Sequence, residues 1–203
     1  MSHKCFISFK KEDKVYRDEI LKKLGQEDVP VKFLDKWIDS EDSDYILQEI
    51  RDTYLADTTV TLFLIGTHSH EDDGVDILGR DNNFFIKREL QASLFDGKGN
   101  TRSGIVGIVL PAMVNKVFTG NYVCPDCGQT HSYVNVDDTT VVREFSANYY
   151  IAPKPGCCWT EKDRYCVLVA YDKFITAPNA YIDLAYEKRY SDISKKISLR
   201  NLR

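Results

Sequence analysis

The chain of 203 residues lacks the patterns that mark several large classes of protein. No apolar run approaches the roughly 18 to 20 residues needed to cross a bilayer, and the first residues do not form a signal peptide. Basic residues are not in excess: the formal net charge is -4 and the pI is about 5.6, which argues against general binding to nucleic acid or acidic membranes. We therefore expect a cytoplasmic protein with no nucleic-acid partner and no membrane partner.

Common catalytic and phosphate-binding motifs are also missing. Neither GxGxxG nor GxxxxGK[ST] occurs, so no glycine-rich phosphate loop is predicted. The GxSxG nucleophile elbow and the HExxH metal motif are absent too, as are internal repeats and low-complexity linkers. The candidates for chemistry must therefore be sought where the fold brings separate segments together.

What the sequence does contain is an alternation of apolar strands with amphipathic helices. The 43% hydrophobic content fits a globular protein with a sizeable core. We predict strands in 4–9, 31–39, 58–66, 103–111 and 163–174, and helices in 11–25, 43–57, 81–94 and 177–200. This succession is typical of an α/β doubly wound sheet, and the run TTVTLFLIG has the continuous apolar character of a central parallel strand.

The pattern changes after Pro111 and recovers with the last predicted strand. We divide the chain into a core of residues 1–111, a cysteine-containing insertion of residues 112–162, and a strand and helix in residues 163–203 that complete the same domain. The insertion contains short alternating segments such as TTVVREFSANYYI, and we expect it to include a small β-hairpin.

Ligands of doubly wound sheets bind beyond the carboxyl ends of the strands. In this chain the corresponding segments are 8–11, 35–37 and 67–69, and the helical residues 84–89 should lie over the same edge. Ser8, Phe9 and Lys10 would line such a site, with Lys10 available for a phosphate, and Thr67 follows the third strand. For Ser8 a strand-end hydroxyl, and for Lys10 a solvated charge, are equally good interpretations.

Three stretches resemble TIR domains. CFISFKKED resembles their first strand and turn, where Ser8, Phe9 and Asp13 take the expected places, and TVTLFLIGT resembles their third strand. FFIKREL resembles the helix motif aromatic-x-x-x-Glu of TIR domains that hydrolyse or cyclise NAD. Phe85 and Glu89 have its spacing, with Phe in place of the usual Trp.

The order of these stretches over residues 3–111 is most similar to the ThsB-type TIR-like proteins of bacterial Thoeris anti-phage systems. The resemblance implies a flavodoxin-like three-layer fold with a central, mainly parallel sheet. It also implies an enzyme that takes NAD as substrate and makes a cyclic or conjugated ADP-ribose signal for a separate effector protein. The resemblance also implies self-association and activation by a phage-derived trigger.

The resemblance implies a role for several individual residues. Glu89 would be catalytic, because a carboxylate stabilises the oxocarbenium character that develops on ribose when nicotinamide leaves. Phe85, one helical turn earlier, could stack on the nicotinamide or the ribose. Asp35 and Trp37 lie in the loop that borders the NAD pocket of TIR domains, and Trp37 either stacks adenine or anchors that loop.

Other functions remain open from the sequence. Phe85 could be a core residue and Glu89 a partner of Lys87 or Arg88, in which case the chain is a non-catalytic TIR-like or receiver-like interaction module. A nucleoside deoxyribosyltransferase-like enzyme is a third class, since such enzymes also carry a Glu on a similar sheet. His68 and His70 alternate in a polar loop, which more often indicates solvent exposure than a metal site.

A separate signal is the stretch CPDCG, which holds Cys124 and Cys127. A CPxCG turn aims two sulfur atoms at one point and forms half of many structural zinc sites. The remaining ligands would come from Cys157 and Cys158, with His131 as the alternative. A zinc ion on this set and a pair of free turn thiols are both compatible with the sequence. Cys5 and Cys166 fall in predicted strands and should be core residues.

Overall fold

The computed structural model describes residues 3–35, 38–40, 42–77, 79–97, 100–151, 153–154 and 156–200. A five-stranded sheet forms its centre in the order β2-β1-β3-β4-β7, and every neighbouring pair is parallel. The strands are β1 (Cys5–Ser8), β2 (Val31–Phe33), β3 (Val60–Ile65), β4 (Gly104–Val109) and β7 (Val167–Ala170). This confirms the predicted doubly wound α/β sheet and its flavodoxin-like order.

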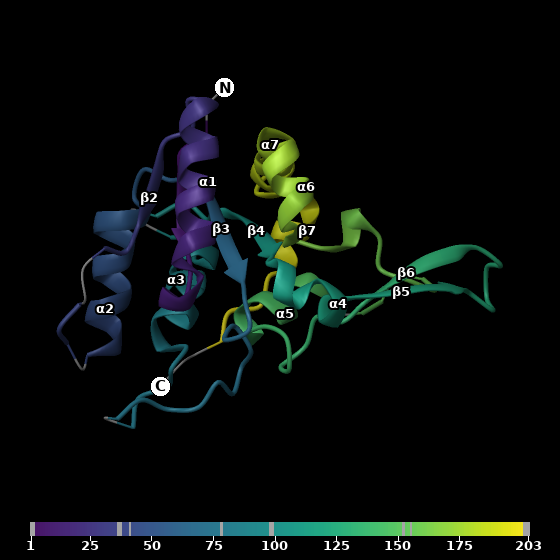
Figure 1. Ribbon diagram of the computed structural model, residues 1–203, viewed down its shortest axis with the longest axis horizontal. Coiled ribbons are helices and arrows are strands. Elements are labelled where there is room, and N and C mark those ends of the chain that lie inside the picture. Colours follow the sequence, from purple (N-terminus) through teal and green to yellow (C-terminus); the bar gives the residue numbers. More distant parts are fainter. Residues whose placement is uncertain are drawn as a thin grey trace.

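Helices cover both faces of the sheet (Figure 1). They are α1 (Lys14–Gln26), α2 (Ser43–Glu49), α3 (Phe84–Leu94), α4 (Val114–Val117), α5 (Arg143–Tyr149), α6 (Tyr171–Thr176) and α7 (Pro178–Lys188). Residues of α1, α6 and α7 share one hydrophobic core, while α3 and α5 share the core on the opposite face. A π-helical segment η2 (Ile50–Leu55) continues α2, and both pack against α3.

The two cores follow from the alternation of side chains along buried strands. In β3, Leu62 and Leu64 point into the core formed with α1, whereas Phe63 and Ile65 point into the core formed with α3. All residues of β3 and β4 are buried, which explains their continuous apolar sequences. Gly104 lets α7 approach β4, because a Cβ atom there would lie 2.0 Å from the Ala185 carbonyl oxygen.

Two predictions about the second half of the chain were wrong in detail. The segment TTVVREFSANYYI, whose alternation suggested strand structure, contains helix α5, and Phe145 and Tyr149 of this helix are buried in the core beside α3. The predicted helix over 177–200 ends at Lys188 and is followed by a short 3₁₀ helix, η5 (Asp192–Lys196).

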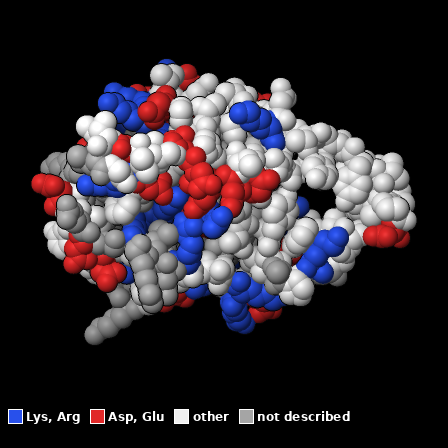
Figure 2. Space-filling model, turned by 90° about the horizontal axis from the view of Figure 1, so that it is seen from below, with Lys and Arg blue, Asp and Glu red and all other residues white. Residues whose placement is uncertain are grey.

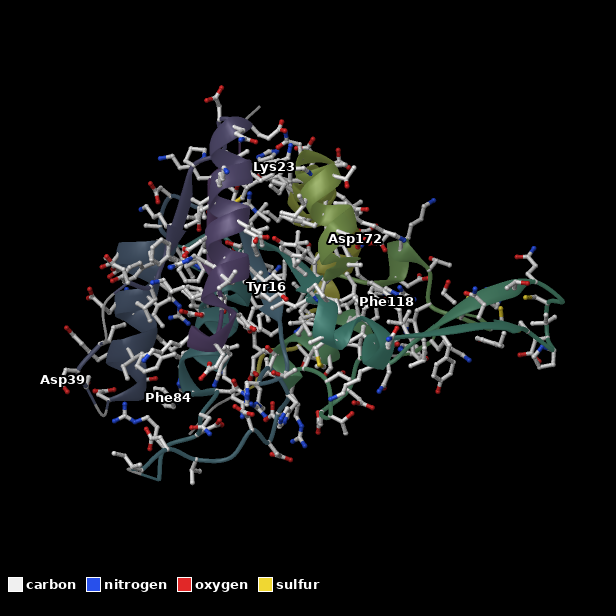
Figure 3. All side chains as sticks on the ribbon, in the orientation of Figure 1. Tyr16, Lys23, Asp39, Phe84, Phe118 and Asp172 are labelled. Atoms are coloured by element: carbon white, nitrogen blue, oxygen red, sulfur yellow. The ribbon has the colours of Figure 1, made fainter. Side chains whose placement is uncertain are left out.

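The small β-hairpin predicted in the insertion is confirmed: it consists of β5 (Phe118–Val123) and β6 (Thr130–Val134), and we call residues 118–134 the hairpin arm. The arm projects sideways from the body beyond Phe118 (Figures 1 and 3). Most of its residues are exposed, and its sequence contains no Lys or Arg and only one acid, Asp126. The part that extends to one side in Figure 2 therefore shows little charge, whereas acidic and basic side chains gather over the body.

The remaining short elements are 3₁₀ helices: η1 (Lys11–Asp13), η3 (Pro111–Met113) and η4 (Glu161–Asp163). Within the described residues, no helix combines the length and the apolar character that spanning a membrane would need. The division of the chain at residues 111 and 162 stays a prediction.

Candidate functional site

The carboxyl end of β1 lies where the winding of the sheet changes direction. Strand β2 lies on one side of β1, and β3, the next strand in the chain, lies on the other. The loops that follow β1 and β3 therefore diverge, which is the position where ligands bind to such sheets. Ser8 is the last residue of β1 and is paired in register with Phe63.

Helix α3 places Glu89 directly over this end of β1. The Ser8 hydroxyl donates a hydrogen bond to Oε2 of Glu89 at 2.6 Å, and only 5% of Glu89 is exposed. Burial raises the pKa of Glu89 to about 8, against the hydrogen bond from Ser8, which favours the carboxylate. The sequence suggested Lys87 or Arg88 as partners of Glu89, but Lys87 pairs with Glu71 and Asp81 instead.

The start of α3 is fixed by the acidic loop of residues 70–82. The side-chain amide of Asn83 donates to the His70 carbonyl at 2.6 Å, and the ammonium group of Lys87 contacts Glu71 and Asp81. Glu71 also accepts from Arg200 at 2.7 Å and from the backbone N–H of Arg143 at 2.9 Å. The loop is thus anchored by cations of the body, and the direction in which α3 presents Glu89 is fixed with it.

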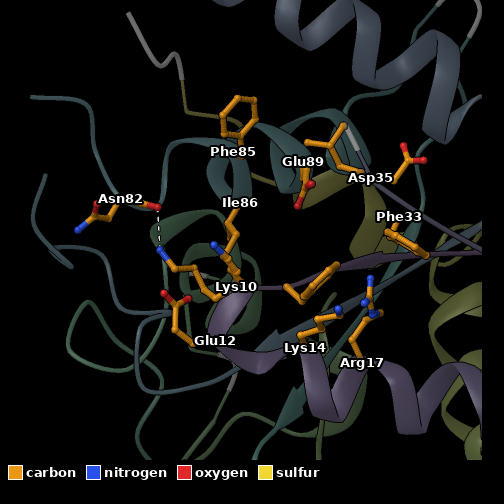
Figure 4. Close-up of a pocket in the computed structure, with 13 residues that line it drawn as sticks. Lys10, Glu12, Lys14, Arg17, Phe33, Asp35, Asn82, Phe85, Ile86 and Glu89 are labelled. Atoms are coloured by element: carbon orange, nitrogen blue, oxygen red, sulfur yellow. Dashed lines mark hydrogen bonds between the residues drawn. The ribbon is translucent and has the colours of Figure 1, made fainter. Parts of the chain in front are cut away.

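A cavity of about 530 Å³ opens beside Glu89, within the range of small-molecule sites. Four basic residues line it: Lys10, Lys11, Lys14 and Arg17. The apolar part of the wall consists of Phe9, Phe33, Leu34, Phe85 and Ile86. Figure 4 shows Glu89 and Phe85 extending from the same helix, with the Glu89 carboxyl turned toward the side that carries Lys14 and Arg17.

Lys10 lies in the cavity wall as the sequence predicted, but its ammonium group is engaged. It donates to the Asn82 carbonyl at 2.8 Å and lies 3.4 Å from Oδ2 of Asp73. Lys10 therefore joins the loop after β1 to the loop before α3. Among the residues of the acidic loop, Asn82 contributes to the cavity wall.

Arg17 and Lys14 are cavity residues that the sequence interpretation missed. The guanidinium of Arg17 stacks on the rings of Phe9 and Phe33, 4.6 and 4.5 Å from their centroids, and pairs with Asp18 at 2.7 Å. Lys14 and Arg17 are three residues apart on α1, so they share one face of the helix. This spacing, directly after the loop of β1, was the signal that could have identified them.

The other predicted site residues differ in their position relative to the cavity. Phe85 is half-buried in the cavity wall with its ring 5.4 Å from that of Phe84, and Asp35 lies exposed at the rim, where it accepts a 3.3 Å hydrogen bond from Tyr54. Thr67 is exposed and does not line the cavity. Trp37 lies outside the described residues.

A second acid, Asp13, lies at the same sheet edge. Its carboxylate packs against the end of β3, where a Cβ atom on Gly66 would lie 2.2 Å from Oδ2 of Asp13. Burial, and then the neighbouring Glu12, raise the pKa of Asp13 to about 6, while His68 and Lys10 act in the opposite direction. His68 and His70 both contact Asp73, and in the described part of the chain they belong to no group of three potential metal ligands.

The predicted metal ligands lie in and beside the hairpin arm. Sγ of Cys124, Cys127 and Cys157 and a ring nitrogen of His131 all lie within 4.8 Å of one another. Cys158, also predicted as a ligand, is not part of this group. Cys5 and Cys166 are buried thiols of the core, in line with their expected place in the strands.

A parallel sheet in the flavodoxin-like order defines an α/β protein whose fold is that of the flavodoxin-like class, to which TIR-like domains belong. Residues 6–77 match the family described as Thoeris protein ThsB, TIR-like domain. This match confirms the predicted resemblance to the ThsB-type TIR-like domain over these residues and supports a defence protein with a TIR-like domain. The match includes Ser8, Lys10 and Arg17 and ends before Phe85 and Glu89. A search of curated proteins finds no match.

Proposed function

We propose that the protein is an NAD-processing TIR enzyme that cleaves the bond between nicotinamide and ribose. The observation that carries the proposal is Glu89, a buried carboxyl at the switch point of the sheet, hydrogen-bonded to Ser8 and open to a cavity. A buried acid with a raised pKa in a cleft is a common sign of an active site. The family match supports the TIR class, and the step to catalysis rests on this geometry.

The reaction would proceed through charge development on the ribose. The electron pair of the C–N bond leaves with nicotinamide, whose ring becomes neutral, and the ribose acquires oxocarbenium character. The Glu89 carboxylate, held by Ser8, would stabilise this charge and orient the attacking group. Attack by water gives ADP-ribose with release of a proton, whereas attack by a nucleophile of the same or another molecule gives a cyclic or conjugated product.

The ionisation of Glu89 sets a condition on this chemistry. With a pKa of about 8, the Glu89 carboxyl is mostly protonated at neutral pH. The nicotinamide ring of NAD is positively charged, and a neighbouring positive charge favours the carboxylate. Substrate binding would therefore ionise the group that the reaction requires, and turnover should rise with pH.

The rest of the cavity wall suits the other parts of a dinucleotide. Lys11, Lys14 and Arg17 supply positive charge for a pyrophosphate, and the aromatic rings of Phe9, Phe33 and Phe85 supply stacking surfaces. Phe85 offers a smaller surface than Trp, so we expect weaker stacking on the nicotinamide than in TIR enzymes with Trp at this place. An uncharged nucleoside would have no use for the basic wall, which disfavours deoxyribosyl transfer.

The signalling role is part of the same proposal. The product, an ADP-ribose derivative, would act on a separate effector protein, and turnover would begin after a phage-derived trigger or self-association. The resemblance to the ThsB-type domain supports proposing these partners together with the activity.

The experiment follows NAD and nicotinamide by chromatography after incubation with extract of phage-infected cells as the source of the trigger. We expect nicotinamide release from the wild type and its loss in Glu89→Gln. Glu12→Gln is the matched control, because Glu12 lines the same cavity but is exposed. Equal release from Glu89→Gln and the wild type would remove Glu89 from the mechanism, and exchange of bases between nucleosides would indicate a transferase.

A non-catalytic interaction module is the second candidate, and one observation favours it. The bond between Ser8 and Glu89 is buried, so it could serve only to fix α3 on β1. In that case NAD would stay intact under every condition of triggering, while Glu89→Gln would still change the stability of the fold.

A further inference from the structure

Four potential metal ligands converge at the hairpin arm, away from the cavity. The Cys127 sulfur lies 3.1 Å from Nε2 of His131, and the Cys157 sulfur lies 3.5 Å from the same nitrogen. All four ligand atoms, including Sγ of Cys124, fall within 4.8 Å of one another. A tetrahedral zinc ion with Zn–S bonds of about 2.3 Å and a Zn–N bond of about 2.0 Å separates its ligands by roughly 3.5–3.8 Å, which these positions approach.

The turn between β5 and β6 directs the first pair of sulfur atoms. The N–H of Gly128 donates to the Cys124 carbonyl at 2.8 Å, and the N–H of Cys124 donates to the Gln129 carbonyl at the same distance. Gly128 has φ +69°, a conformation that glycine adopts without strain. This tight turn places Cys127 and Cys124 on the same side of the hairpin end, as a two-thiolate clamp requires.

The pairing of the two strands supplies the third ligand. His131 lies opposite Tyr122 in the antiparallel register, close to the turn that carries the first two cysteines. Cys157 comes from the segment before η4, 26 residues after His131 in the sequence. The four ligands therefore come from two separate parts of the chain, which a bound ion would join.

The arm also needs a source of order other than a hydrophobic core. Five of the six residues of β5 are exposed, and three of the five in β6 are too. A two-stranded hairpin of this kind is at best marginally stable in water. Cys124 is nevertheless only 2% exposed, because it lies inside the ligand group. Figure 3 shows how far the arm extends beyond Phe118 at its base.

We propose that Cys124, Cys127, His131 and Cys157 bind one structural zinc ion that fastens the hairpin arm to the segment before η4. Binding deprotonates the three thiols, releases their protons and leaves three thiolates and one neutral imidazole on the metal. Four protein ligands fill a tetrahedral shell and leave no position for water, which is the mark of a structural site. The ion takes no part in the chemistry proposed for Glu89.

The direct test measures metal in the protein purified under reducing conditions with zinc present. We expect about one zinc ion per chain, and after exchange for Co²⁺ an absorption spectrum of tetrahedral, thiolate-rich coordination. A protein that contains no zinc, takes up none when zinc is added and gives no such Co²⁺ spectrum would overturn the proposal. A disulfide within the group under the same reducing conditions would also overturn it.

Variants test the choice of ligands. Cys157→Ser and His131→Ala should each weaken zinc binding by more than about a hundredfold, since loss of a direct ligand costs more than loss of an outer partner. Cys158→Ser is the matched control, because it removes the neighbouring thiol and should leave binding unchanged. If Cys158→Ser loses zinc and Cys157→Ser keeps it, the ligand set is wrong.

Hydrogen exchange covers the case in which a variant fails to fold. Removal of zinc from the wild-type chain by a chelator should accelerate exchange in residues 118–134 and leave β3 and β4 protected. Unchanged exchange in the arm after removal of the metal would contradict a structural role.

Discussion

The sheet edge that carries Glu89 and the hairpin arm that carries the thiols hold their polar side chains in place by different means. At the sheet edge, packing on both faces fixes β1 and α3, and Glu89 is buried against Ser8 without any additional ligand. The arm has almost no core, and its order depends on four side chains that converge on one point. The packing at the sheet edge can therefore keep Glu89 buried with a raised pKa. The order of the hairpin arm, in contrast, should change when metal is added or removed, without an effect on the sheet.

The largest effect on stability should come from disturbing the sheet where α7 approaches it. In Gly104→Val the new side chain would meet the backbone of Ala185, since even a Cβ atom would lie 2.0 Å from its carbonyl oxygen. We expect a loss of about 3 kcal/mol or more in the free energy of unfolding, measured with urea. Gly156→Ala, where a Cβ atom meets nothing within 4 Å, is the control and should change little. Equal stability of the two variants would contradict the tight packing.

The second effect is a pH dependence that arises from Glu89. Its pKa is about 8 in the native chain and 4.5 in the unfolded chain, so the native chain holds one more proton between these values. The stabilisation from this proton is complete below pH 4.5 and is lost as the pH rises to about 8, by up to about 1.4 kcal/mol for each pH unit. Glu89→Gln should remove this slope.

Urea unfolding of both proteins at several pH values gives the measurement. Asp13, whose pKa is raised to about 6, contributes a slope of the same sign that persists in both proteins, so the difference between them isolates Glu89. Identical slopes for the wild type and Glu89→Gln would show that the carboxyl is not buried as described.

A smaller effect should follow from removal of the Ser8 hydroxyl. Ser8→Ala leaves the Glu89 carboxyl without its donor, which should cost about 1–2 kcal/mol and raise the pKa of Glu89 further. The midpoint of the pH profile of nicotinamide release should then move to higher pH. Ser93→Ala removes another buried hydroxyl of the same region, one that donates to the backbone, and should leave the midpoint in place. If the midpoint moves equally in Ser8→Ala and Ser93→Ala, the direct coupling of Ser8 to Glu89 is contradicted.

The smallest effect on the sheet should come from the arm. Because the arm shares little packing with the body, Cys124→Ser should change the free energy of unfolding of the sheet by less than about 0.5 kcal/mol. Circular dichroism during urea unfolding measures this, with Cys158→Ser as the control. A large loss of sheet stability in Cys124→Ser alone would mean that the arm supports the core.

The same contrast explains how far the sequence could be interpreted. The strands were predictable because buried parallel strands need continuous apolar residues. The position of Glu89 over the sheet edge was predictable because its spacing from Phe85 and its place after the third strand are local features. Helix α5 was missed because REFSANY lies in an alternating apolar stretch, although Val142, Phe145 and Tyr149 recur at helical spacing and are buried. The helical spacing of these three residues was therefore a better guide to the structure than the alternation of apolar residues.

Other features depend on contacts between distant segments and leave no local signal. The engagement of Lys10 with Asn82 and Asp73 requires the path of the acidic loop, 63 residues or more away in the sequence. The membership of His131, and not Cys158, in the ligand group depends on the register of the hairpin and on the course of the chain before η4. Spacing alone could name the candidates but could not choose among them.

Catalysis by Glu89 is tested most directly by nicotinamide release at about pH 8.5, where most of the wild-type carboxyl is ionised even without substrate. We expect release by the triggered wild type and by Glu12→Gln, and a loss of roughly 100- to 1,000-fold in Glu89→Gln. The fold of each variant is checked by circular dichroism. Full release from a folded Glu89→Gln variant would contradict the assignment of catalysis to this carboxyl.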